Sequence, residues 1–397
     1  MKVAIAITGC GSVGPWGLGI SQLFTRLLAG VQPSSSTGAG TSDAGGGDRS
    51  IVRADLAAVA QALADERTRD LNSETRMSLV AAREAIHGAA LTGERLERDA
   101  TGIAVSTRYA GLNDYVAILD AGRTGGRVNP SQGPQAGLNA PAAHLSIRLG
   151  AAGPNATFSS GSVGGLDALS WAMGELEQGG AEAIIACGVD VIPPAAARPL
   201  REGASSSVTR PFDRDRQGPL LSEMAVALVL EDEGRARRRG VEPLALLTPV
   251  ARAFSTTRTP SEISTRALST ALENGPRPRE LAACLAGANG SKVGDAAEAT
   301  VLSALLGTQT PVSAIKGGLG EAPGADSVAQ LAVAACSFAR GMLPPTAGHQ
   351  HADPELPQLA ITTRARPISP GPIVAHSWDT DRAGALIVLP PRVGRRL

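Results

Sequence analysis

The stretch from Asn155 to Asp190 constrains the fold most, because it reads as a strand, a tight turn, a helix and a second, buried strand. Apolar residues recur in it at three- and four-residue steps and predict an amphipathic helix, namely Leu166, Leu169, Met173 and Leu176. Gly179 and Gly180 are predicted to end that helix. A strand-to-helix turn presents its apex residue at a helix N-terminus, where backbone N–H groups favour negative charge. Ser162 is predicted to lie at this apex, where enzymes place nucleophiles.

The composition limits the classes of protein that remain. The chain has 397 residues and is 43% apolar, enough for one large domain or two fused ones. Its 37 basic and 37 acidic residues cancel, so no net charge attracts nucleic acid or an anionic membrane. No apolar run approaches the ~20 residues of a membrane span. The N-terminal MKVAIAITGCG reads as a first strand, turned by Gly9-Cys10-Gly11, and not as a signal peptide. We expect a cytoplasmic, globular α/β protein.

Cysteine and histidine positions predict no metal site. Four cysteines are widely spaced in apolar surroundings and contain no CxxC pair, so they are expected to be buried thiols in a reducing compartment, namely Cys10, Cys187, Cys284 and Cys336. His349 and His351 form an HxH pair in a Pro-rich loop, but without a third ligand a solvated loop is expected. No cofactor is predicted.

Strands and helices alternate in two series, which predicts a layered α/β architecture. We place the halves at residues 1–240 and 241–397. The Ser/Gly-rich residues 33–50 are predicted to form a flexible surface loop. No close sequence repeat links the halves, so any duplication must be read from structure.

Several segments together resemble one enzyme family. These are ITGCGSVGPWGLGISQLFTRLLAG, LNAPAAHLSIRLGAAGPNAT, GLDAL, RPFDRDRQGPLLSEMAVALVLE, IKGGLG and RGMLPPT. In order and content they resemble a β-ketoacyl-acyl-carrier-protein synthase of the elongating type, over nearly the whole chain. The resemblance implies the thiolase fold, with five αβαβα layers and two pseudo-duplicated halves. It also implies a dimer joined edge to edge and an acyl carrier protein as partner.

The active-site positions depart from that family. Its Cys-His-His triad maps onto Ser162, Asn289 and Glu321. Lys316 and Glu298 match its supporting positions and are expected to form a buried pair. The family's C-terminal GFGG loop, which helps to form the oxyanion hole and the gate, is replaced by Trp378, Asp379, Thr380 and Asp381.

These replacements remove the chemistry of decarboxylative condensation. That reaction needs a thiolate to carry the acyl chain and two neutral imidazoles to stabilise the enolate. A serine hydroxyl needs a nearby base, Asn289 cannot accept a proton, and an anionic Glu321 repels an enolate and a malonyl carboxylate. Loss of one oxyanion-hole donor alone costs ~10²–10³ in rate. Autonomous condensation is therefore not expected.

Members of the family that lack the triad include the chain-length factors of type II polyketide synthases. The resemblance implies a heterodimer with a catalytic ketosynthase and a chain tunnel across the interface, although Ser162 departs from the usual Gln. The matching tunnel segment is Tyr109–Leu119. Within it Leu112, Tyr115 and Leu119 fall on one helical face. We expect Tyr109 and these three residues to line the tunnel of a polyketide or polyene chain; ordinary core packing is the alternative.

Other interpretations remain open. Ser162 could be only a small residue or cap at a crowded helix start. Alternatively, it could act as the nucleophile of an acyltransferase or hydrolase on carrier-protein thioesters. That role would require Glu321 as a base with a pKa raised by burial. Ser160–Gly164 matches the nucleophile motif GxSxG only weakly. His376 could approach this site. A homodimer that binds acyl chains is a third interpretation.

Two classes are rejected. Gly9, Gly11 and Gly14 fit GxGxxG, but Pro15-Trp16-Gly17 interrupt the helix that a dinucleotide site requires. The basic run from Arg235 to Arg239 is too short for a nucleic-acid surface and is read as a solvated helix end.

Overall fold

Two sets of five strands follow the same spatial order in the computed structural model, which describes residues 4–33, 51–68, 70–92, 97–193, 208–273 and 275–392. The first set lies in the order β5-β4-β6-β8-β1 and the second in the order β12-β11-β16-β17-β9. Numbered along the chain, each order is 3-2-4-5-1. In both sets strand 2 is parallel to strands 3 and 4, and strand 5 is antiparallel to strands 4 and 1. The duplication that the sequence hides is thus visible in the topology.

The bounds of the strands are as follows: β1 Ile5–Gly14, β4 Thr101–Ser106, β5 Asn155–Phe158, β6 Ala183–Asp190, β8 Met224–Asp232, β9 Ala245–Leu247, β11 Ala283–Leu285, β12 Pro311–Ser313, β16 Ile373–Trp378 and β17 Arg382–Leu389. Strand β9 pairs with both β1 and β17 and so joins the two sets into one sheet. The short strands β2 Gly17–Leu18, β10 Ala251–Phe254 and β14 Ala360–Ile361 extend it. Two small ladders pair β3 Ile51–Val52 with β7 Leu221–Ser222, and β13 Met342–Leu343 with β15 Arg366–Pro367.

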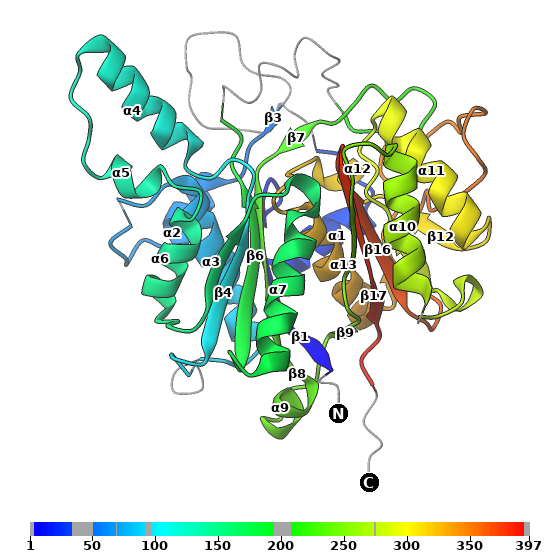
Figure 1. The fold of residues 1–397 in the computed structure, drawn as a ribbon, viewed down its shortest axis with the longest axis horizontal. Helices are drawn as coiled ribbons and strands as arrows, with labels where there is room; N and C mark the ends of the chain where they lie inside the picture. Colours follow the sequence, from blue (N-terminus) through cyan, green and yellow to red (C-terminus); the bar gives the residue numbers. More distant parts are fainter. Residues whose placement is uncertain are drawn as a thin grey trace.

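Helices form three layers around the two sets of strands (Figure 1). Helices α7 (Gly164–Gln178) and α13 (Asp326–Arg340) lie between them. The outer faces are covered by α3 (Ser73–Gly88) and α6 (Ala140–Leu149) on one side, and by α10 (Pro260–Glu273) and α11 (Lys292–Leu306) on the other. This is the five-layered αβαβα arrangement of the thiolase fold, as expected. The remaining helices are α1 Ile20–Leu28, α2 Leu56–Ala62, α4 Leu112–Thr124, α5 Gln132–Gln135, α9 Glu233–Arg238, α12 Lys316–Leu319, η2 Gly161–Val163 and η3 Pro278–Glu280.

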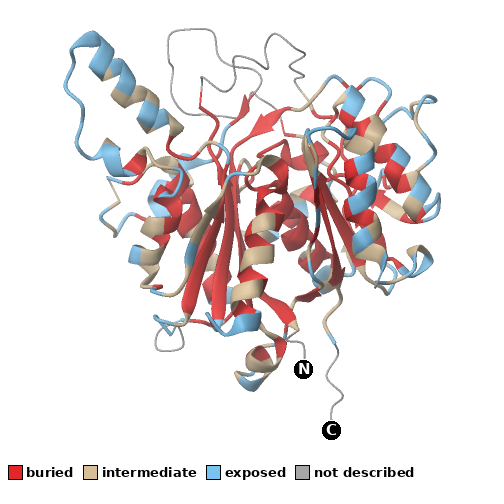
Figure 2. Ribbon diagram, viewed as in Figure 1, coloured by how far each residue is buried: buried red, intermediate tan, exposed pale blue. Residues whose placement is uncertain are grey.

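Burial follows the layers (Figure 2). One apolar cluster fills the central layer around Leu166, Leu169 and Leu331, and two others lie under the outer helices. Strands β6 and β8 are almost wholly buried, which explains their continuous apolar runs, whereas β5 at the edge of the sheet has no buried residue. Helix α4 differs, since no residue in it is buried.

The N-terminal strand does not turn at Gly9-Cys10-Gly11, and that prediction is wrong. Strand β1 runs on to Gly14, with a register shift against β8 between Ile7 and Gly9. A Cβ on Gly9 would clash with the carbonyl oxygen of Ala85, and one on Gly11 with that of Ala81. These glycines therefore let α3 cross the sheet at close range, a constraint that sequence inspection mistakes for a turn.

Several smaller expectations can be compared with the described residues. Gly179 ends α7 with φ +76°. The four cysteines are free thiols, with Cys336 only half-buried. No helix in the described ranges is long and apolar enough to cross a bilayer. The predicted flexible loop lies outside the described residues from position 34 to 50.

The basic run at α9 is more ordered than a solvated helix end. Arg239 donates to both carboxylate oxygens of the buried Glu231, at 2.7 and 3.1 Å, and to the carbonyl oxygens at the end of α3. Arg235 contacts the same carboxylate at 3.2 Å. Arg235 and Arg239 are thus paired within the chain, while Arg238 remains exposed.

Candidate functional site

The three triad positions meet at the carboxyl ends of parallel strands, the end where ligands bind in such sheets. Ser162 follows β5, Asn289 follows β11, and Glu321 follows β12 and α12. Asn289 Nδ2 donates to Glu321 Oε1 at 2.8 Å. The Ser162 hydroxyl does not contact Glu321; it donates over 3.5 Å to Asp326 Oδ2 at the start of α13. Asn289 and Glu321 are therefore in direct contact. Ser162 is linked to them through Asp326 and Lys316. Asp326, the partner of the Ser162 hydroxyl, is a carboxylate that the sequence did not single out.

Glycines set the apex that carries Ser162. Gly161 has φ +62°, and a Cβ there would overlap the Asp379 carboxylate. Cβ atoms on Gly164 and Gly165 would stand 2.6 Å from Ser106 Oγ and 2.5 Å from Ser327 Oγ. Ser162 itself is 5% exposed, so the site is crowded. The N-cap of α7 is Val163 and the Ser162 side chain makes no capping bond, so the interpretation of Ser162 as a cap is wrong.

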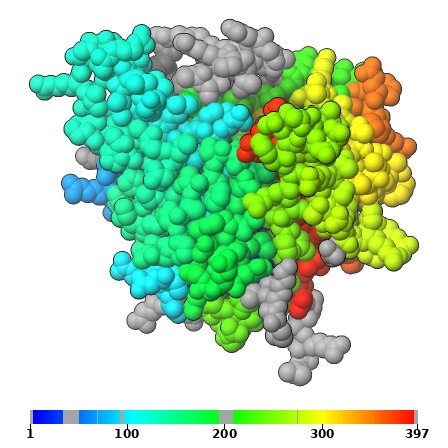
Figure 3. Space-filling view, viewed as in Figure 1, coloured from blue at the N-terminus to red at the C-terminus, as the bar shows by residue number. Residues whose placement is uncertain are grey.

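The turn between β16 and β17 places a carboxylate at the apex. Asp379 Oδ2 accepts the backbone N–H of Ser162 at 3.3 Å and contacts Arg108 Nη1 at 3.4 Å. The Asp379 N–H in turn donates to the carbonyl oxygen of Arg382 at 2.8 Å, which fixes the turn. Figure 3 shows atoms of this C-terminal segment, in red, at the surface between the two halves. A thioester carbonyl that needed the Ser162 N–H would have to displace a carboxylate.

Trp378 is held in a slot rather than lying free in a gate. A Cβ on Gly294 would overlap the indole ring, and one on Gly287 would lie 3.1 Å from Trp378 Cδ1. The first turn of α11 therefore accommodates the ring only because position 294 is glycine. Thr380 donates its backbone N–H to Asp379 Oδ1 at 2.8 Å.

Lys316 balances two buried carboxyl groups. Its Nζ lies 2.8 Å from Asp326 Oδ2 and 3.0 Å from Glu321 Oε1, and the side chain is 5% exposed. Burial lowers the pKa of Lys316, but the two carboxylates outweigh burial and hold that pKa above its ordinary value. Burial raises the pKa of Asp326, and the Lys316 charge offsets only part of that rise. The Lys316 cation thus holds Glu321 and Asp326 together beside Ser162.

The expected pair between Lys316 and Glu298 is wrong. Glu298 Oε1 instead contacts His376 Nδ1 at 2.6 Å and accepts the Gly287 N–H at 2.8 Å, with both side chains fully buried. The alternation of β16 points His376 toward α11, so the imidazole is engaged by Glu298 and its position does not support a role beside Ser162. Glu321 stands where the family has a histidine, and this anion pairs with Lys316. Glu298 pairs with His376 instead.

Asp190 links the site to the root of α4. Its carboxylate accepts the backbone N–H groups of Arg108 at 2.7 Å, Tyr109 at 3.0 Å and Gly324 at 2.6 Å. Burial raises the pKa of Asp190 to about 6. Burial also raises the pKa of Tyr109 to about 12, with Arg108 opposing and the anions of Asp190, Glu321 and Asp379 adding to it. Tyr109 thus lies between the degenerate triad and α4.

The predicted tunnel residues divide into two environments. Tyr109 packs on Ile51, Ile192 and Leu221. Leu112, Tyr115 and Leu119, here called the α4 stripe, lie on the helix that projects from the body in Figure 1. Tyr115 is 50% exposed and Leu119 48%. The alternative that the stripe is ordinary core is therefore wrong for these two residues.

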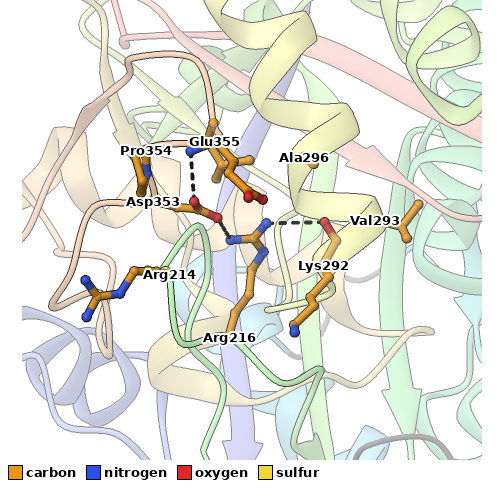
Figure 4. A pocket seen from close by; sticks show the side chains of 9 residues that line it. Arg214, Arg216, Lys292, Val293, Ala296, Asp353, Pro354 and Glu355 are labelled. Atoms are coloured by element: carbon orange, nitrogen blue, oxygen red, sulfur yellow. Dashed lines mark hydrogen bonds and ion pairs between the residues drawn. The ribbon is translucent and has the colours of Figure 1, made fainter.

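The HxH loop gains further neighbours in the structure. Ligand atoms of Asp213, Asp215 and His351 lie within 4.8 Å of one another. However, Asp213 already accepts backbone N–H groups of residues 350, 351 and 215, at 2.6, 2.7 and 2.8 Å, so its carboxylate clamps two loops. The adjoining 580 Å³ cavity is shown in Figure 4, where Arg216 points between Asp353 and the carbonyl of Lys292. Arg214 points away from that pair.

Asp326, Arg108 and Asp190 are the site residues that sequence reasoning missed. Asp190 is the last residue of the buried strand β6, and Asp326 begins α13, five residues after Glu321. Polar residues at strand ends and helix starts were the available signal.

A buried carboxyl group near the root of α4 yields a pH prediction. Glu74, in the first turn of α3, is 2% exposed and its Oε1 has no partner in the described chain. Burial raises its pKa to about 7. Since the native state then binds more protons than the unfolded state between about pH 4.5 and 7, stability falls as pH rises through that interval.

Glu74→Gln should remove this loss. We expect about 1–3 kcal/mol more stability than the parent chain at pH 8 and no difference at pH 4.5. Urea unfolding at both pH values measures it. A variant that is less stable than the parent at pH 8 would contradict a costly Glu74 charge. Exposed Glu355→Gln serves as the control.

Comparisons with known proteins agree with this fold. The model of the β-ketoacyl synthase N-terminal domain matches residues 2–236, and that of the C-terminal domain matches residues 250–350. The chain belongs to the β-ketoacyl synthase family. It is 28% identical over 434 residues to the oxytetracycline polyketide β-ketoacyl synthase 1 of Streptomyces rimosus, covering 98% of this chain and 97% of that protein.

Two solved structures share the fold over nearly the whole chain. The ishigamide ketosynthase/chain length factor has a TM-score of 0.86 at 21% identity, covering 98% of this chain and 100% of that one. A type II polyketide synthase acyl carrier protein in complex with its ketosynthase has a TM-score of 0.83 at 19% identity, with the same coverage.

Proposed function

We propose that this chain is a non-condensing ketosynthase-like subunit, a chain-length factor of a type II polyketide synthase. It would pair with a Cys-His-His ketosynthase and shape the tunnel that holds the growing polyketide or polyene chain. One observation carries the proposal. The Asp379 carboxylate accepts a hydrogen bond from the Ser162 N–H, in a site whose triad positions hold serine, asparagine and glutamate.

The charge distribution opposes condensation at this site. The enolate formed on loss of CO₂ needs neutral or positive hydrogen-bond donors. Asp379, Asp326 and Glu321 bring carboxyl groups to the apex, and the cation of Lys316 is already shared by two of them. A malonyl group entering here would meet like charge, and no imidazole stands at a triad position to take its negative charge. A structural subunit has no need of that chemistry.

The projecting helix supports a partner. Exposed Tyr115 and Leu119 give α4 an apolar face that the described parts of the chain leave uncovered. Strand β5 ends the sheet with a free edge, where a second sheet can pair. The similarity to a ketosynthase/chain length factor and to a ketosynthase in complex with its carrier protein favours a catalytic ketosynthase and an acyl carrier protein as the two partners.

The tunnel would run from the apex that carries Ser162, past Tyr109, to the α4 stripe. Tyr109 lies close enough to Glu321 and Asp379 for their charges to act on its hydroxyl. Asp190 fixes the backbone between the two ends. In this arrangement Leu112, Tyr115 and Leu119 meet the partner and limit the length of the chain.

The competing function is acyl transfer by Ser162. It needs a base on the hydroxyl, yet Glu321 bonds Asn289 and Lys316, and Asp326 lies 3.5 Å from Ser162 Oγ while paired to Lys316. No contact favours this alternative over a structural role.

The test is intact-protein mass after incubation with an acyl-loaded carrier protein and a candidate ketosynthase. We expect an acyl adduct on the ketosynthase cysteine, no adduct on this chain, and turnover within about twofold of the parent complex for Ser162→Ala. An adduct on this chain that disappears in Ser162→Ala would overturn the proposal in favour of acyl transfer. If no adduct forms and no ketosynthase associates with this chain, the remaining interpretation is a homodimer that binds acyl chains.

A further inference from the structure

A cavity lies apart from the Ser162 site, between α1, α13 and the end of α3. It measures about 250 Å³. Its floor is buried and mainly apolar, formed by Gly9, Cys10, Phe24 and Ala335. Gly88 and Ala339 stand at its mouth and are exposed. Asp326, at the Ser162 site, precedes Cys336 by ten residues on α13, which is about 15 Å along the helix. The cavity is therefore a separate site.

Small residues keep this cavity open. A Cβ added to Gly88 would meet only the Gly9 Cα, at 3.8 Å, so the space beside it is unfilled. Ala335 and Ala339 present only methyl groups from α13. Cys10 and Cys336 add two thiols, and burial raises the pKa of both, to about 12 for Cys336. Both thiols are therefore neutral at physiological pH and act as small apolar groups.

One cation stands at the mouth. Arg340 is exposed and lines the cavity, and its guanidinium makes no ion pair or hydrogen bond within the described parts of the chain. Glu84 is a partly buried acid whose charge acts on both thiols. Its two oxygens accept the N–H groups of Ser12 and Ile20, each at 2.9 Å, and among the described residues it forms no ion pair with the guanidinium. An apolar cavity with a free cation at its rim is complementary to an amphipathic anion.

We propose that this cavity binds a small amphipathic carboxylic acid, its apolar tail on the Cys10 and Phe24 floor and its carboxylate on Arg340. At about 30 Å³ for a water-sized group, 250 Å³ holds roughly eight such groups. A straight chain of about six to nine carbon atoms fits this size. The proposal does not depend on the chain-length-factor role.

Octanoate is the probe, and octan-1-ol is its uncharged counterpart. Calorimetric titration of the full chain at pH 7.4 should give a Kd for octanoate of about 0.1–1 mM. Gly88→Leu and Ala339→Leu fill the cavity from two different helices and should each weaken binding at least about tenfold. Ala57→Leu, at an exposed alanine of α2, is the matched control and should bind like the parent.

Arg340→Met tests the charged end separately. It should weaken octanoate about fivefold or more and change octan-1-ol by less than about twofold. Arg279→Met, at another exposed arginine, should leave both probes unchanged. The proposal is overturned if octanoate does not bind, if both filling variants bind it like the parent, or if Arg340→Met affects acid and alcohol alike. Octanoate binding that persists in both filled variants would place the binding site elsewhere, for example beside Ser162.

Discussion

Lys316→Met should lower the free energy of unfolding at pH 8 by about 3–5 kcal/mol, the cost of removing one partner from a buried ionic cluster. The substitution keeps most of the side-chain volume and leaves Asp326 and Glu321 without their cation. Because burial raises the pKa of Asp326, its carboxyl group can take up a proton when the cation is gone, and the loss should shrink toward pH 5.5. Urea unfolding of the full chain at the two pH values measures both effects.

A compensated variant separates charge from packing. Lys316→Met combined with Glu321→Gln and Asp326→Asn removes all three charges and should recover most of the lost stability at pH 8. Lys292→Met, at an exposed lysine of α11, is the control and should change stability by less than about 0.5 kcal/mol. Equal unfolding midpoints for Lys316→Met and the parent at pH 8 would show that the cluster is not held by this cation.

Tyr115→Asp combined with Leu119→Asp should weaken association with the catalytic ketosynthase by about a hundredfold or more. The two side chains are the most exposed members of the α4 stripe, and a charge buried there without a partner is costly. Stability of the isolated chain should change by less than about 0.5 kcal/mol, because both residues are half exposed. Titration of the two subunits in an interaction assay gives the affinity.

The matched control adds two acids to a different face of the same helix. Asn113→Asp with Thr124→Asp should bind the ketosynthase like the parent chain. In the reconstituted synthase, Tyr115→Ala should lengthen the product if this ring limits the tunnel. Unchanged affinity in the double acidic variant would place the interface elsewhere, and unchanged product length in Tyr115→Ala would remove Tyr115 from the tunnel.

Much of the architecture was predictable because it depends on local patterns. The apolar periodicity of 164–178, the glycine at 179 and the run 183–190 fix a helix and a strand whatever surrounds them. The ordered segments shared with β-ketoacyl synthases then predicted the thiolase fold. The convergence of Ser162, Asn289 and Glu321 followed from the same ordering.

Tertiary structure decided which of these groups touch. The sequence predicted that Lys316 pairs with Glu298. In the structure Lys316 pairs with Asp326 and Glu321, and Glu298 contacts His376. Gly9 and Gly11 read locally as a turn, yet they serve the passage of α3 across β1. A helical stripe has the same spacing whether it is buried or exposed, so only the fold could leave Tyr115 and Leu119 in solvent. The contact of Asp379 with the Ser162 N–H joins residues 217 positions apart, and no local pattern encodes such a distance.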